Sequence, residues 1–141
     1  MKKSPEQLLC LHAAIIMFLA FFAGLMIGLV ATGQAEGNFA DWRLAHVEPL
    51  INSILMLAVA GCMGKLALSD KQALVITYCL IIMGYCNSVF GLMRGFTGAL
   101  GYEFTSDLAN NITAFAGMLG VPMGIIAFGL IILGAIKHTK N

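Results

Sequence analysis

Charged side chains are scarce in this chain of 141 residues, because Asp, Glu, Lys and Arg make up 11% of it and hydrophobic residues 60%. An ordinary soluble domain carries roughly 25% charged residues. The net charge is only +1, so the chain lacks the basic surface that nucleic-acid binding requires. The composition therefore excludes a nucleic-acid-binding module and is typical of a membrane protein.

Internal repeats, low-complexity segments and an extended polar stretch long enough for a soluble domain are also missing. Without repeats, a transporter built from two inverted halves has little support. The four cysteines fall in or beside apolar runs, and none belongs to a metal-type C-x-x-C pair. Disulfides are not expected at such positions, so the chemistry must come from a few polar side chains.

Four long apolar runs fill most of the chain. A bilayer with a hydrocarbon core about 30 Å thick is crossed by about 20 helical residues, and none of these runs alternates as a barrel strand would. The first run is too long for the apolar part of a signal peptide, so we interpret it as a retained helix. The sequence predicts an all-α fold, a single domain over 1–141 that forms an integral membrane four-helix bundle, with spans near residues 8–32, 44–68, 72–93 and 110–136.

The lysines predict the orientation of the bundle. With four spans, both termini and the central loop share one side, and that side holds Lys2, Lys3, Lys65, Lys71, Lys137 and Lys140. Cytoplasmic loops carry an excess of positive charge, so the termini are expected in the cytoplasm. The turn at 69–71 offers Ser69 or Asp70 as the N-cap of the third helix.

Polar residues within spans are costly and are therefore candidates for function. Asn52 and Asn87 each lie within about two turns of the outer ends of their helices, so we expect them to meet in one outer pocket. Pro49 either starts the second helix or kinks it. The full set of polar candidates is His46, Glu48, Asn52, Ser53, Tyr78, Tyr85, Asn87, Arg94, Asn110, Asn111 and Thr113.

His46 has several interpretations. The other two histidines belong near the opposite face, so a haem held by two histidines of one subunit is excluded. A metal centre with one protein ligand would keep an open position, which suits substrate binding. Zinc would want three or four ligands, and only Glu48 and Asp41 are close in sequence. In the simplest alternative His46 is an interfacial anchor beside Trp42, and Glu48 is a solvated carboxylate at the helix start.

Three short motifs add a family resemblance. The segments WRLAHVEPLIN at 42–52, SDK at 69–71 and GYCN at 84–87 resemble the styrene oxide isomerase family, small four-helix membrane enzymes of bacterial styrene degradation. The family pattern is W-x-x-A-H-x-x-P-x-x-N, then D-K, then G-W-x-N. It aligns without a gap from Trp42 to Asn87 and covers about the middle third of the chain.

The resemblance implies a cofactor and a reaction. His46 would be the axial ligand of the iron of a ferric haem b, Asn52 a hydrogen-bonding group in the haem pocket, and Asn87 a second catalytic asparagine. The implied assembly is a homotrimer in the bacterial inner membrane, with haem at the subunit contacts. The implied reaction converts a small hydrophobic epoxide to an aldehyde by a Meinwald-type rearrangement, with ferric iron as the Lewis acid and no second cofactor.

Two positions depart from the family pattern. Gly91 stands where the family has a tyrosine thought to act in catalysis, and Met83 stands where it has an aspartate. Three functions therefore stay open. The chain is an epoxide isomerase, a non-isomerase haem protein for small-ligand binding or electron transfer, or a haem-free structural membrane protein.

Overall fold

The structure is a computed structural model that describes residues 4–138. In these residues four long helices follow one another, with a short 3₁₀ helix after the second and no strand. Each long helix is apolar enough and long enough to cross a membrane, which indicates a multi-pass membrane protein. The elements are α1 (Pro5–Ala31), α2 (Phe39–Cys62), η1 (Met63–Lys65), α3 (Asp70–Thr97) and α4 (Leu108–His138).

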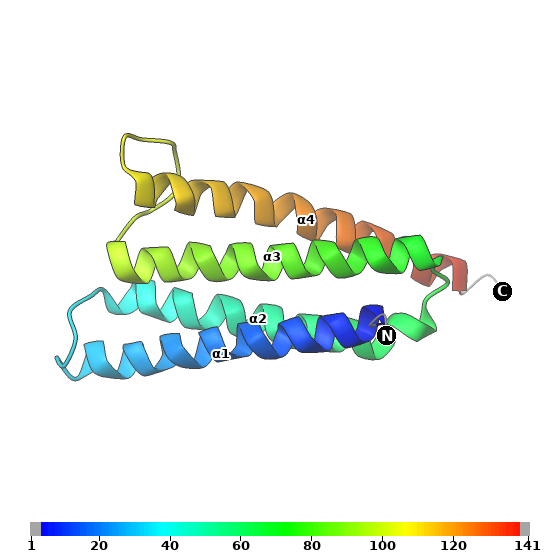
Figure 1. The fold of residues 1–141 in the computed structure, drawn as a ribbon, viewed down its shortest axis with the longest axis horizontal. Helices are drawn as coiled ribbons and strands as arrows, with labels where there is room; N and C mark the ends of the chain where they lie inside the picture. The colour runs from blue at the N-terminus through cyan, green and yellow to red at the C-terminus, as the bar shows by residue number, and fades with distance from the viewer. Residues whose placement is uncertain (1–3, 139–141) are drawn as a thin grey trace.

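The four helices run side by side along the long axis of the molecule (Figure 1). α1 packs mainly on α2 and α4 mainly on α3, and further contacts of α3 with α2 and α1 join the two pairs. The connections 32–38 and 98–107 lie at one end, which we call the loop end, and the start of α1 and the end of α4 lie at the other (Figure 1).

Side chains cap the helix ends. Ser69 is the N-cap of α3, and a capping box joins it to Gln72. Of the two N-cap candidates that the sequence offers, Asp70 is instead the first residue of the helix. Ser4 and Gln7 form the same arrangement at the start of α1. These bonds satisfy backbone N–H groups that have no partner inside the helix.

α2 begins at Phe39, earlier than the apolar run suggests, because Asn38 caps it by accepting a hydrogen bond from the backbone N–H of Ala40. Pro49 lies inside the helix and does not start it. A proline there removes the N–H that would bond to the carbonyl of Ala45. Membrane helices tolerate this loss when their neighbours compensate.

Glycines set the closest contacts between the helices. An ideal Cβ at Gly91 would lie 2.8 Å from the Cα of Ala45, and one at Gly95 would lie 2.9 Å from the Trp42 ring. These two glycines therefore let α3 approach α2 closely. Similarly close contacts occur at Gly24, Gly120 and Gly124, whereas Gly28 faces open space.

Candidate functional site

His46 lies about two turns into α2 from the loop end and points toward α1. Its Nδ1 is 2.8 Å from the backbone carbonyl oxygen of Ala20. A carbonyl oxygen only accepts hydrogen bonds, so Nδ1 must carry the proton and donate it. The lone pair of the neutral ring then lies on Nε2. The ring is partly exposed, so this nitrogen is suited to bind a metal ion.

Gly24 provides the room for this histidine. An ideal Cβ at Gly24 would lie 3.0 Å from the Nδ1 of His46, which is tighter than ordinary van der Waals contact. The glycine and the Ala20 carbonyl lie one turn apart on α1, so together they fix the plane of the imidazole ring. The spacing of Gly24 and Gly28 in the sequence indicates close helix packing, but it does not indicate a contact with His46 or a role for the Ala20 carbonyl.

Asn52 and Asn87 meet between α2 and α3, as expected. The Nδ2 of Asn87 donates to the Oδ1 of Asn52 over 3.4 Å, and the Nδ2 of Asn52 donates to the backbone oxygen of Glu48 at 2.7 Å. Each amide nitrogen carries two N–H groups, and these bonds use one from each. The pair therefore retains donor capacity for an oxygen-bearing ligand.

Glu48 is not a solvated carboxylate at a helix start. It lies well inside α2, because the helix begins at Phe39. Its Oε2 is buried and has no hydrogen-bond partner, and this oxygen would be 3.4 Å from a Cβ at Gly91. The helix-start interpretation is wrong, since it assumed that the helix begins near Pro49.

The space around Gly91 is too small for a side chain. A side chain at this position would collide with the backbone of Ala45 before it reached the carboxyl group of Glu48. α2 and α3 therefore pack too closely at this level to leave space for a larger side chain at position 91.

Trp42 is a core residue and not a lipid-facing anchor. Only 1% of it is exposed, and its ring lies 4.8 Å from that of Phe96 in an edge-to-face arrangement. Next to it, both Nε and Nη2 of Arg94 donate to one oxygen of Asp41, at 3.1 and 2.9 Å. Because Trp42 is buried, it does not form an exposed aromatic belt with His46.

Several other polar candidates serve local structure. The side chains of Asn110 and Asn111 bind backbone groups of residues 101–105 and so hold the loop before α4. Hydroxyl groups of Ser53 and Thr113 donate to carbonyls one turn earlier in their own helices. These bonds satisfy the side chains without a ligand.

One polar contact had no sequence signal. The Nδ1 of His12 on α1 lies 3.0 Å from the hydroxyl oxygen of Tyr85 on α3, a partly buried pair 73 residues apart. The two rings pack edge to face with centroids 5.7 Å apart. The contact depends on the packing of α1 against α3, which periodicity within one helix does not report.

The described residues contain no set of side chains that could bind zinc. Within residues 4–138 there is no group of three or more His, Cys, Asp or Glu side chains that could hold a metal ion. Asp41 is engaged by Arg94, and Glu48 lies against α3 while His46 lies against α1. A centre that needs only one protein ligand is the kind that His46 fits.

His46 and the asparagine pair contact different neighbours of α2. His46 faces Ala20 of α1, whereas Asn52 faces Asn87 of α3. The structure thus brings the two asparagines together but does not bring His46 to them within one chain.

Comparison with known proteins gives two matches. The family described as styrene oxide isomerase matches residues 5–136. Among curated proteins, the styrene-oxide isomerase of Pseudomonas fluorescens is 24% identical over 109 residues, which cover 77% of this chain. The matched region spans 63% of the length of that relative.

Proposed function

Because the chain belongs to the styrene oxide isomerase family, we propose that it is a membrane haem b protein that isomerises small hydrophobic epoxides to aldehydes. The observation that carries this proposal is the hydrogen bond between His46 and the backbone of Ala20. The Nδ1 of His46 donates to the Ala20 carbonyl, which leaves Nε2 as the metal-binding nitrogen.

Ala20 and Gly24 support His46 as the axial ligand. Metal-binding histidines usually donate their other ring N–H to a carbonyl or carboxylate, which orients the ring and makes the ligand more basic. Here the carbonyl is that of Ala20, and Gly24 keeps the ring plane in place. These contacts would hold His46 as the residue that binds the haem iron.

Ferric haem would supply a Lewis acid for the epoxide oxygen, so that no second cofactor is required. The residues of the chain would bind and orient the substrate. Asn52 and Asn87 offer amide N–H groups to an oxygen atom, and all four long helices are apolar enough to cross a membrane. Exclusion of water by such a lining would favour rearrangement over hydrolysis.

We propose a homotrimer in the bacterial inner membrane with cytoplasmic termini. The lysines near the termini and the 65–71 turn support this orientation. The arrangement of His46 and the asparagines supports a site at a subunit contact, because one chain presents them to different helices. Assembly would then be needed for activity.

A second candidate is a haem protein without isomerase activity that binds a small ligand or transfers electrons. It is favoured by Gly91, where no hydroxyl group exists and no room for one is left beside Ala45. The two candidates share His46 as the ligand. They differ in whether an epoxide is turned over.

The test is an assay of the purified haem-loaded protein, with styrene oxide and a set of alkyl epoxides and no added cofactor. The proposal predicts aldehyde formation that is lost in His46→Ala. A protein that is red and binds carbon monoxide after reduction, but leaves every epoxide unchanged, would support the second candidate. A colourless protein from haem-supplemented cells would contradict both and leave a structural role.

A further inference from the structure

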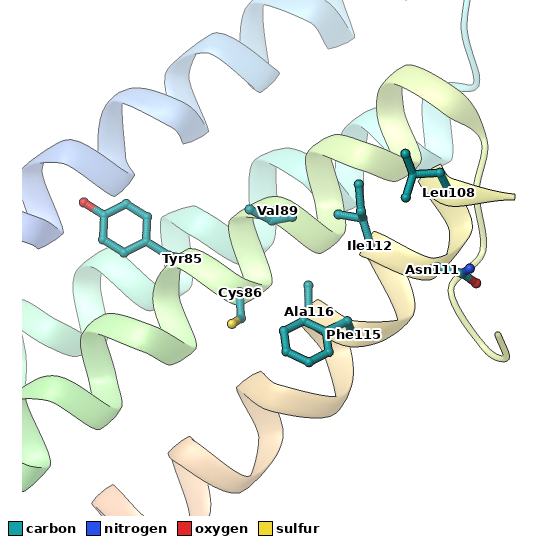
Figure 2. A pocket seen from close by; sticks show the side chains of 8 residues that line it. All are labelled: Tyr85, Cys86, Val89, Leu108, Asn111, Ile112, Phe115 and Ala116. Carbon is teal, nitrogen blue, oxygen red and sulfur yellow. The ribbon is translucent and has the colours of Figure 1, made fainter.

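A groove of about 410 Å³ runs between α3 and the first turns of α4, near the loop end. Its lining includes Cys86 and Val89 of α3 and Ile112, Phe115 and Ala116 of α4 (Figure 2). Pockets that bind small organic ligands usually measure roughly 300 to 1,000 Å³. The groove therefore has the size of a ligand site.

The groove has a mostly apolar lining, and the polar residue at each of its ends is hydrogen-bonded within the protein. None of the residues lining the groove carries a charge. At the deep end, Tyr85 turns its ring toward α1, where its hydroxyl meets His12 (Figure 2). At the other end, Asn111 is bonded to the backbone of Thr105. Both polar groups at the ends are thus already engaged, which favours a neutral occupant.

The groove adjoins the asparagine pair. An ideal Cβ at Gly120 of α4 would lie 3.3 Å from the Cβ of Cys86 and 2.9 Å from the Oδ1 of Asn87. Cys86 lines the groove, and its neighbour Asn87 contacts Asn52. Gly120, one turn past the last lining residue of α4, therefore packs against both Cys86 and Asn87.

The groove is open toward the side of the bundle that would face lipid. Phe115 is 61% exposed, Ile112 is 40% exposed and Val89 is 39% exposed, and all three lie in helices that can span a membrane. A neutral apolar molecule dissolved in the bilayer would reach the groove without crossing water.

We propose that this groove binds a neutral, mostly apolar small molecule that carries one oxygen atom and enters from the bilayer. The proposal rests on the proposed function, since aryl and alkyl epoxides belong to that chemical class. In the groove such a molecule would lie against Cys86, the chain neighbour of Asn87 on α3. A lipid chain fits less well, because the lining covers only about 12 Å along α4, less than the roughly 15 Å of one bilayer leaflet's hydrocarbon.

Cys86 gives a direct readout of occupancy. The protein in phospholipid nanodiscs would be treated with N-ethylmaleimide, with and without acetophenone, an unreactive aryl ketone of the proposed class. Mass spectrometry would then report modification at Cys86 and at Cys10, an exposed cysteine outside the groove that serves as the internal control. Neither haem nor turnover is needed for this measurement.

The proposal predicts that acetophenone at about ten times its dissociation constant slows labelling of Cys86 about tenfold, with Cys10 unchanged. No protection, or equal slowing at both cysteines, would overturn it. So would a Cys86 that reacts only after detergent separates the subunits, because a second copy would then fill the groove. Protection that follows the lipid content and not acetophenone would assign the groove to acyl chains.

A variant pair links the groove to turnover. Val89→Trp fills the groove from its rim, whereas Ile82→Trp places the same ring two turns away on the same face of α3, outside the lining. Val89→Trp should raise KM about tenfold and leave kcat within about twofold, and Ile82→Trp should change neither. Equal effects of the two variants would contradict the proposal. If the wild type turns over no epoxide, the labelling experiment still shows whether the groove binds a ligand.

Discussion

The Nδ1 atom of His46 on α2 lies 2.8 Å from the carbonyl oxygen of Ala20 on α1. This single contact sets the tautomer of the ring and the direction in which Nε2 points. Because the carbonyl belongs to a different helix, the orientation of the proposed haem ligand depends on how closely α1 approaches α2. Gly24 lies one turn further along α1 and permits that approach.

Gly24→Val is expected to weaken haem binding. An added side chain would push the His46 ring away from Ala20, because even an ideal Cβ lies only 3.0 Å from Nδ1. Loss of such a supporting contact typically weakens metal binding about 10- to 100-fold. Haem titration of the apoprotein measures the change. Gly28→Val is the matched control, since a Cβ at Gly28 meets nothing within 4 Å; equal losses in both variants would contradict the role assigned to Gly24.

Gly91→Ala is expected to destabilise the bundle by about 1 to 3 kcal/mol, the usual cost of overpacking. The new methyl group would lie 2.8 Å from the Cα of Ala45, and a backbone atom cannot move aside as a side chain does. Unfolding in mixed detergent micelles measures the free energy. Gly129→Ala, in open space on α4, should leave stability unchanged or raise it. If the two alanines behave alike, the contact between α2 and α3 is looser than described.

Asn52 and Asn87 are expected to be energetically coupled. Interhelical hydrogen bonds in membrane proteins average about 0.6 kcal/mol, and the 3.4 Å separation places this one at the weak end. A double-mutant cycle with Asn52→Ala and Asn87→Ala, read from the free energy of unfolding, measures the coupling. The distant pair Asn52→Ala and Asn110→Ala should be additive. Additivity in both cycles would mean that the amide contact contributes nothing.

Arg94→Gln is expected to cost about 1.5 to 3 kcal/mol, the range for hydrogen bonds to charged groups. Arg94 donates twice to one oxygen of Asp41, and both side chains are largely buried, with 14% and 13% exposed. Thermal unfolding of the purified protein reports the loss. Arg43→Gln removes an exposed arginine nearby and should have little effect. A similar loss in both variants would point to a general effect of charge on the assembly.

Local rules predicted the helices and one of their caps. Apolar length alone identified four helical segments, and the Ser-Asp-Lys turn offered Ser69 or Asp70 as an N-cap, because both signals lie within a few neighbouring residues. The start of α2 at Phe39 was not predicted. Hydropathy reports where a chain is apolar, whereas Asn38 starts the helix in a more polar stretch before the apolar run.

Contacts between helices were harder to predict. Depth in the membrane placed Asn52 and Asn87 at similar levels, and they do meet. The sequence could not show that His46 turns to α1 while Asn52 turns to α3, because the choice depends on which helix packs on each face of α2. The His12 and Tyr85 contact depends on the same information and was missed.

The most direct test of the central claim is the visible absorption spectrum of the purified protein from haem-supplemented cells, compared with that of His46→Ala prepared in the same way. We predict a haem Soret band in the wild type that is lost or strongly altered in the variant, and partly restored by added imidazole. An identical Soret band in both proteins would show that another residue holds the haem. A colourless wild type would contradict the account entirely.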